Sequence, residues 1–184
     1  FRNMTYKFRP IQTSWGCFGI VTHGPAVIRT FLPQNRHRLD IAVKSQFPTY
    51  IQDDEIAEDL AEMVVKYFKC GPADFNSVHI DLPGLSEFKQ LILRTCRQIP
   101  FAHTVSYAQL ACRTGYDRAF RAVGNALAAN PLPLIIPCHR VIRSDGSIGR
   151  FSANGDQKLK EKLIRHESAA LQTKKTDPSN QFSH

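Results

Sequence analysis

The chain has 184 residues, of which 42% are hydrophobic, and this is enough to bury the core of one compact domain or of two small ones. Its formal net charge of +8 favours an anionic partner, first nucleic acid and then an anionic membrane surface, although a soluble basic enzyme has the same charge. No apolar run approaches the roughly 20 residues of a membrane-spanning helix, so we expect a soluble protein without a membrane partner.

Residues 1–83 are predicted to form an α/β domain with a small antiparallel sheet and a helix. Residues 5–50 mix β-prone stretches with glycine and proline, which indicates two or three short strands joined by turns. From Asp53 the pattern becomes helical, with acidic residues in the first turn and apolar residues on one face. These apolar residues are Ile56, Leu60, Met63, Val64, Tyr67 and Phe68. The turn-rich segment 70–84 marks the expected domain boundary.

Residues 84–170 are predicted to form a second, mainly helical domain. Ser86 is the expected N-cap of a helix that stops before Pro100. Ser106 and Gln109 have the spacing of a capping box, and Gly115 is the expected end of that helix.

A further helix is predicted over 117–129, directly after the capped one. Two short helices separated by a few residues that include glycine predict a helix-turn-helix. Residues 131–136 are expected to be extended, 158–168 to form a last short helix, and 171–184 to be a disordered polar tail.

The helix predicted over 117–129 is rich in small residues, and Arg118 and Arg121 project from it. Small residues such as Ala122 and Gly124 permit close approach of a grooved surface, while arginines contact phosphates or enter a base stack. Both features suit DNA. The alternative interpretation is an alanine-rich helix that packs tightly against its neighbour.

Cys138 lies directly before His139, at the end of an apolar segment. The thiolate is the reactive form of cysteine, and a neighbouring base increases its population, so the pair suggests nucleophilic chemistry. Side chains that follow one another in an extended segment point to opposite sides, and only a turn would bring these two together. A buried structural cysteine therefore stays the alternative.

The motifs IPFAHTVSYAQLA, RAVGNALAANPLPLIIPCHRVI, DGSIGRFS and KLKEKLIRHE lie between about Phe88 and Glu167. They closely resemble the O6-alkylguanine-DNA alkyltransferases, the suicidal repair proteins related to the C-terminal part of bacterial Ada. The resemblance implies a DNA repair enzyme that flips O6-alkylguanine out of duplex DNA. It would transfer the alkyl group irreversibly to its own cysteine in a single turnover. We expect a monomer that needs no cofactor.

The resemblance also assigns catalytic and DNA-binding roles. Cys138 would be the alkyl acceptor, His139 the base that acts through a water, and Glu167 the carboxylate that orients this base. Arg121 would fill the gap left by the flipped guanine, which lowers the cost of unstacking. The DNA-binding residues that we expect are Arg118, Arg121, Ala122 and Gly124.

Other residues are expected to form the guanine pocket. Tyr107 would contact the flipped nucleotide and donate to its base ring, and Asn130 would tie the recognition helix to the cysteine turn. Arg140 is expected to pair with a carboxylate as a structural residue outside the site. The full set expected to bind substrate is Tyr107, Asn130, Pro133, Val141, Phe151, Ser152 and Lys160.

Two points concern departures from the family pattern. Ala102 and His103 stand where the family often has glycine, which we interpret as a packing variation. Some members hold a structural zinc in the N-terminal domain, but the cysteines and histidines here have neither that spacing nor a C-x-x-C motif, so no metal site is predicted.

The five cysteines are odd in number and irregularly spaced, and no signal segment is recognised before them. They predict reduced thiols in an intracellular protein, in the nucleus of a eukaryote or in the cytoplasm or nucleoid otherwise.

Two other functions stay open. Alkyltransferase-like proteins sense the same lesions without transferring the group, but they lack the acceptor cysteine that this chain keeps. A helix-turn-helix regulator with a redox-sensitive Cys138 would need base-reading side chains, in which the predicted recognition helix is poor.

Overall fold

Three long neighbouring strands dominate the N-terminal part of the computed structural model, which describes residues 5–149 and 157–175. The strands are β1 (Tyr6–Thr13), β2 (Gly16–His23) and β3 (Ala26–Gln34). They pair antiparallel, and the short β4 (Tyr50–Gln52) joins β1 in parallel, so the four-stranded sheet has the order β3-β2-β1-β4. The expected small antiparallel sheet is thus mostly confirmed, with one short parallel strand added.

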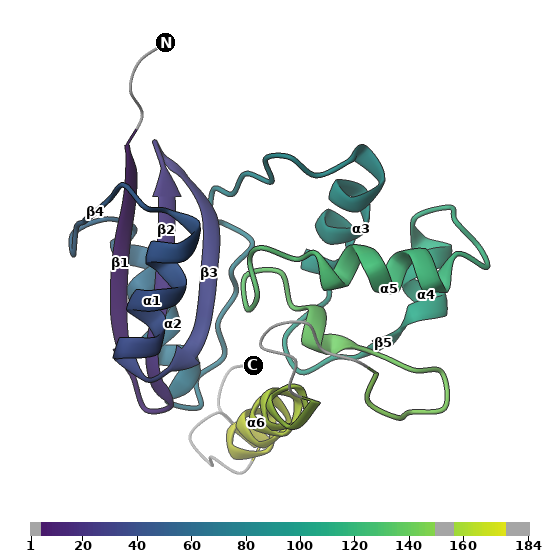
Figure 1. Cartoon of the computed structure of the whole chain (residues 1–184). Helices are drawn as coiled ribbons and strands as arrows, with labels where there is room; N and C mark the ends of the chain where they lie inside the picture. The colour runs from purple at the N-terminus through teal and green to yellow at the C-terminus, as the bar shows by residue number, and fades with distance from the viewer. Residues whose placement is uncertain (1–4, 150–156, 176–184) are drawn as a thin grey trace, which may run out of the picture.

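Two helices cover the two faces of this sheet: α1 (Arg36–Gln46) and α2 (Glu58–Phe68). Figure 1 shows α1 in front of the sheet and α2 behind it. Alternate residues of a strand point to opposite faces, so on β2 Ile20 packs in the core that contains α2, and Val21 packs with Leu39 and Val43 of α1. Helix α1 was not predicted, because it buries little more than this apolar pair among charged residues.

Helix α2 begins at Glu58, five residues later than predicted. Asp53 instead continues the pairing of β4, since its amide donates to the Phe8 carbonyl and its carboxylate pairs with Lys7 at 2.7 Å. Ala57 has a φ of 52°, in the left-handed region, so the helix cannot extend back through it.

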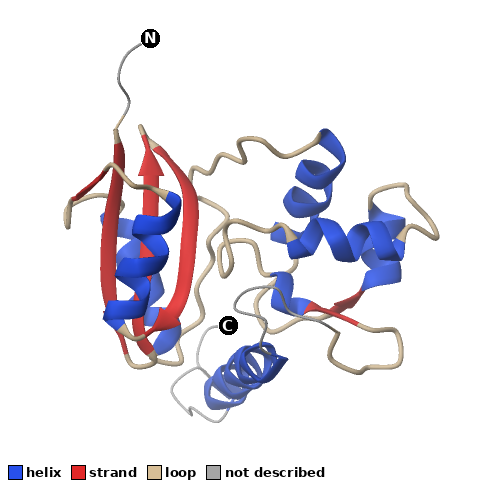
Figure 2. Cartoon of the chain, viewed as in Figure 1, coloured by secondary structure: helices blue, strands red, loops and turns tan. Residues whose placement is uncertain are grey.

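Four helices form the C-terminal part: α3 (Glu87–Arg97), α4 (Tyr107–Arg113), α5 (Phe120–Ala128) and α6 (Gln157–Lys175). Ser86 caps α3, and the capping box of Ser106 and Gln109 at α4 is present, as predicted. Helices α4 and α5 are joined by the turn 114–119, and Figure 2 shows them crossing at the far side from the sheet. None of the described helices is long and apolar enough to cross a membrane.

Two further predicted helix boundaries are wrong. Helix α5 begins at Phe120 rather than at 117, because Arg118 has a φ of 73° and still belongs to the turn. Helix α6 continues to Lys175, so residues 171–175 are helical rather than part of a tail; Ala170, which is 3% exposed, anchors this last part. The remainder of the predicted tail lies outside the described residues.

The N-terminal sheet contacts the helical part through its edge strand β3, of which Val27 pairs with Ile80. The Thr30 amide on β3 donates to the Pro131 carbonyl at 3.0 Å, and the Thr30 hydroxyl donates to the Pro133 carbonyl at 2.8 Å. The segment 131–136 is a series of turns with an isolated bridge between Pro133 and Ile136, not the extended run that the sequence suggested. It therefore covers the sheet edge, which would otherwise present unpaired backbone groups.

Candidate active site

The cysteine–histidine dipeptide lies in a tight turn. Cys138–Arg140 form one turn of 3-10 helix, and β6 (Val141–Ile142), which follows, pairs in parallel with β5 (Val105–Ser106). A helical turn does not alternate its side chains as an extended strand does, so the geometric objection to a cooperating Cys138 and His139 is removed. The β5–β6 pairing also brings the start of α4 beside this turn.

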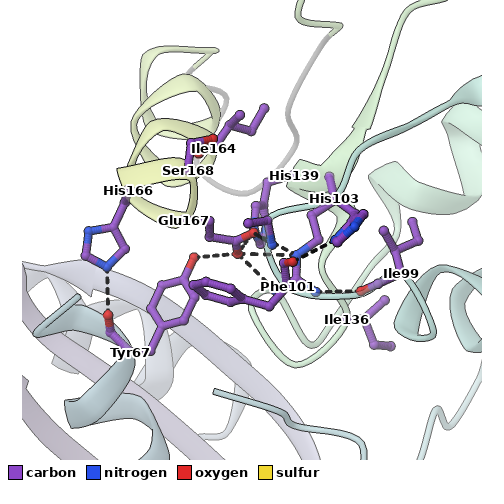
Figure 3. A network of polar contacts seen from close by, with 12 residues as sticks. Tyr67, Ile99, Phe101, His103, Ile136, His139, Ile164, His166, Glu167 and Ser168 are labelled. Carbon is purple, nitrogen blue, oxygen red and sulfur yellow. Dashed lines mark hydrogen bonds and ion pairs between the residues drawn. The ribbon is translucent and has the colours of Figure 1, made fainter. Parts of the chain in front are cut away.

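A buried carboxylate, that of Glu167 on α6, gathers the polar groups around the turn (Figure 3). His139 Nε2 lies 2.7 Å from Glu167 Oε1, and the Arg140 guanidinium donates to both carboxylate oxygens, at 2.9 Å to Oε2 and 3.0 Å to Oε1. The Ala102 amide donates to Oε2 at 2.9 Å, and the Tyr67 hydroxyl donates to Oε1 at 2.8 Å. The carboxylate is therefore fixed from four sides.

The protonation states of this network follow from burial and charge. Burial would raise the pKa of Glu167, but the hydrogen bonds and charges of His139 and Arg140 outweigh it and hold that pKa well below its ordinary value. Burial lowers the pKa of His139, although Glu167 opposes this, so the imidazole is neutral at neutral pH. An ionised carboxylate only accepts, so Nε2 carries the proton and the buried Nδ1, without a hydrogen bond among the described residues, is a proton acceptor.

The Cys138 thiol needs such an acceptor. It is 5% exposed, and burial raises its pKa, while the hydrogen bond from Asn130 and the charge of Lys160 act in the opposite direction. Burial also lowers the pKa of Lys160 to about 8. The thiol is thus protonated at neutral pH, and its activation requires removal of the proton.

Asn130 connects the end of α5 to the cysteine turn, as predicted. Its amide nitrogen donates to Cys138 Sγ at 3.1 Å and to the Ile136 carbonyl at 2.9 Å, while its amide oxygen accepts from the Leu132 amide at 2.9 Å. Lys160 donates to the Val141 carbonyl, so these two residues of the expected pocket are also in contact.

The ring of Tyr107 packs against a glycine that the sequence analysis did not single out. A Cβ atom on Gly149 would lie 2.7 Å from the Tyr107 hydroxyl, so a larger residue cannot fit there without moving the ring. On the other side, a Cβ on Gly124 of α5 would be 3.9 Å from Tyr107, in ordinary contact. In the sequence, Gly149 follows the turn dipeptide Asp145–Gly146 by three residues. A second glycine so close to a turn indicates a position where the backbone closely approaches another group, here the Tyr107 ring.

Of the expected DNA-binding residues, Arg121, Ala122 and Gly124 lie on α5, and Arg118 lies in the turn before it. Arg118, Arg121 and Ala122 are exposed, whereas Val123, Ala126 and Leu127 are buried. One face of the helix packs in the core, which agrees with the alternative interpretation of its alanine-rich composition, and DNA contact by the exposed face stays a prediction. Phe151 and Ser152 lie outside the described residues, and Pro133 is buried beside the turn.

The sequence analysis missed Tyr67 as a member of the Glu167 network, and it did not foresee that Arg140 and Ala102 bind the same carboxylate. Arg140 does pair with a carboxylate, as expected, but with the same carboxylate that holds His139. Ala102 is more than a packing variation, because its φ of 58° lies in the region that glycine adopts without strain. Tyr67 comes from α2, in the part of the chain without a recognised motif.

Tyr67 offers a direct test of this network. We expect Tyr67→Phe to lower the free energy of unfolding by about 1–2 kcal/mol, because a buried carboxylate loses a hydrogen bond. Urea denaturation measures the loss. Tyr116→Phe is the matched control, since Tyr116 is 45% exposed. Equal stabilities of the two variants would contradict the role of the Tyr67 hydroxyl.

Among residues 5–149 and 157–175, no group of three histidine, cysteine or acidic side chains could hold an ion.

Comparison with known proteins finds a family model and several relatives that match the part of the chain that contains this site. The family model "6-O-methylguanine DNA methyltransferase, DNA binding domain" matches residues 87–169. The mouse methylated-DNA–protein-cysteine methyltransferase is 49% identical over 79 residues, which are 43% of this chain but only 37% of the mouse protein.

Longer matches reach into the N-terminal part. A methylated-DNA–protein-cysteine methyltransferase of Methanosarcina barkeri is 32% identical over 66% of this chain and 75% of its own length. A DNA base-flipping protein of Thermus thermophilus is 36% identical over 74% of this chain and 89% of its own. The crystal structure of Mycobacterium tuberculosis OGT in complex with DNA matches with a TM-score of 0.74 and 26% identity, over 89% of this chain and 94% of that one.

Proposed function

Because the chain belongs to the methylated-DNA–protein-cysteine methyltransferase family, we propose that it repairs duplex DNA by moving the alkyl group of O6-alkylguanine onto Cys138. The observation that carries the proposal is the 3-10 turn that holds the Cys138 thiol and, as its next residue, a histidine base bound to a buried carboxylate. Asn130 fixes the sulfur, and Glu167 fixes His139 with its unprotonated Nδ1 available.

The proposed reaction is a direct displacement at the alkyl carbon. The thiol proton passes through a water to His139 Nδ1, and the ionised Glu167 stabilises the resulting imidazolium. The sulfur forms the new bond to the alkyl carbon while the bond between that carbon and guanine O6 breaks. The departing guanine takes up a proton, for which Tyr107 is the proposed donor, since burial raises its pKa and keeps the hydroxyl protonated. The thioether formed is stable, so each molecule acts once.

Duplex DNA is the proposed macromolecular partner, bound by one molecule of the protein. Three features support it: the net charge of +8, the exposed Arg118 and Arg121 at the start of α5 and in the turn before it, and the relative of known structure that was solved with DNA. The small Ala122 and Gly124 would let this helix approach the minor groove, with Arg121 in the place of the extruded base.

Intact-mass spectrometry with a duplex that contains one O6-methylguanine tests the reaction. We expect a gain of one methyl group per molecule, mapped to the Cys138 peptide, and no gain in Cys138→Ala. Lesion binding without a mass change would replace the proposal with a lesion sensor. Neither binding nor a mass change would overturn it altogether.

Arg121→Ala tests the DNA-bound step. We expect the single-turnover rate on the duplex to fall about tenfold, because part of the cost of unstacking a base, a few kcal/mol, is no longer offset. Arg38→Ala on α1 removes the same charge from an exposed position on the other side of the molecule and serves as the control. A rate for Arg121→Ala equal to that of the control would refute the role of Arg121.

A further inference from the structure

A second cysteine–histidine pair lies where α2 meets α6, outside the active site. Cys70 Sγ, just beyond the end of α2, is 3.7 Å from Nδ1 of His166 on α6. The other ring nitrogen of His166, Nε2, is 2.6 Å from the backbone carbonyl oxygen of Tyr67, as Figure 3 shows.

The carbonyl of Tyr67 determines which nitrogen of His166 carries the proton. A carbonyl oxygen only accepts hydrogen bonds, so Nε2 is the donor. In the neutral ring, Nδ1 then has a lone pair directed at the Cys70 thiol. A nucleophile, a base within hydrogen-bonding reach and a third group that orients the base are the parts of an activated nucleophile.

The surroundings of the pair hold the base and expose the thiol. His166 is 9% exposed, and its ring packs against Trp15 and Tyr67, with centroid distances of 4.9 and 5.3 Å. Cys70 itself is exposed. The backbone amide of Cys70 donates to the same Tyr67 carbonyl as His166, at 3.1 Å, which fixes cysteine and histidine relative to each other.

We propose that Cys70 is a second modification site, which reacts directly with small soft electrophiles such as alkyl halides. The sulfur forms a bond to the electrophilic carbon, the halide leaves with the electrons of its bond, and His166 Nδ1 takes the thiol proton. The site needs no DNA, because its thiol is at the surface, and it does not rest on the function proposed for Cys138.

The chain contains a matched control for this reactivity. Cys112 on α4 is also exposed, and Arg113 follows it as Lys69 precedes Cys70, so each thiol has a basic neighbour along the chain. Within the described part of the chain, no hydrogen bond joins Cys112 to a histidine. The two cysteines therefore differ chiefly in the presence of the base.

Competitive labelling of the full chain with limiting iodoacetamide, followed by peptide mapping, tests the proposal. In the folded protein we expect Cys70 to react at least about tenfold faster than Cys112, at the low end of what a positioned base contributes. In urea the two should react at equal rates, because the pair is then separated. A rate ratio near one in the folded protein would overturn the proposal.

His166→Gln removes the base and keeps an amide that can donate to the Tyr67 carbonyl. We expect it to reduce the Cys70 rate to that of Cys112 while leaving Cys112 unchanged. An unchanged ratio in folded His166→Gln would also overturn the proposal. The folded-to-urea comparison in the unmodified chain gives a decision even if this variant does not fold.

Discussion

Glu167→Gln is expected to lower the free energy of unfolding by about 3–5 kcal/mol at neutral pH, because it leaves the buried Arg140 guanidinium without its counter-charge. Arg140 is 5% exposed, and among the described residues it would keep a hydrogen bond to the Ile99 carbonyl and a contact with the Phe101 ring, neither of which supplies a negative charge. The NH₂ group of the glutamine would also face groups that now donate hydrogen bonds to the carboxylate, so those hydrogen bonds would be lost. Urea denaturation measures the loss.

The same substitution should slow alkyl transfer in the protein that remains folded. Without the carboxylate, the imidazolium of His139 is not stabilised, and a loss of about 10²–10⁴-fold in the single-turnover rate is expected. Glu161→Gln is the matched control, since Glu161 lies on the same helix in an exposed ion pair with Arg165. Exposed pairs contribute about 0–1 kcal/mol, so this control should keep both stability and rate. Equal behaviour of the two variants would sink the proposed role of Glu167.

Acid stability should show the contribution of this carboxylate. The folded pKa of Glu167 is lowered, so its stabilisation is present above the ordinary value of 4.5 and is lost as the pH falls below it. The lowered pKa of His139 acts in the same direction, because below about 6.5 the unfolded chain takes up a proton that the folded one does not. We therefore expect the unmodified chain to lose stability as the pH is lowered from about 6.5 to below 4.5, which urea denaturation at a series of pH values measures.

Asn130→Asp is expected to have the second large effect, at nearly constant side-chain volume. One carboxylate oxygen can still accept from the Leu132 amide, but the other would face the Ile136 carbonyl and Cys138 Sγ, to which the asparagine now donates. The hydrogen bond to the Ile136 carbonyl is lost because two acceptors then face each other, the thiol can supply only a weak S–H donor, and a buried charge is added, so about 3 kcal/mol of stability should be lost.

The added charge should also oppose formation of the Cys138 thiolate, because a negative group nearby raises the pKa of a thiol. We expect the single-turnover rate to fall about 100-fold, since proton removal becomes harder. Asn125→Asp, at an exposed position of the same helix α5, is the control. If it matches Asn130→Asp in denaturation and in rate, the link between α5 and the cysteine turn has no functional role.

Much of the fold could be predicted where the signal is local. The caps at Ser86 and Ser106 depend on residues three positions apart, and both are present. Helix α1 also has an N-cap, Asn35, but it buries only Leu39 and Val43, so its apolar residues do not form the periodic pattern that would predict a helix. The start of α5 was misplaced because a positive φ at Arg118 is not encoded by its residue type.

The residues of the candidate site could likewise be predicted where they belong to a local motif and not where they come from a distant part of the chain. The sequence motif places Cys138, His139 and Asn130 within one short segment, and the resemblance adds Glu167. Tyr67 could not be found like this, since it is 100 positions from Glu167 and comes from the part of the chain that carries no motif. Only the packing of α2 against α6 brings its hydroxyl to the carboxylate.

The hydrogen bonds from Thr30 to the segment 131–133 attach the N-terminal sheet to the residues that precede the Cys138 turn. An amide exchanges its proton with solvent only when its hydrogen bond opens. The Thr30 amide, on β3, donates to the Pro131 carbonyl, two residues before Pro133, which we predict to lie in the substrate pocket. Its exchange rate therefore reports, from the other half of the molecule, how often the segment below Cys138 separates from the sheet. If substrate binding stabilises this segment, the Thr30 amide should exchange more slowly, although β3 itself does not contact the substrate.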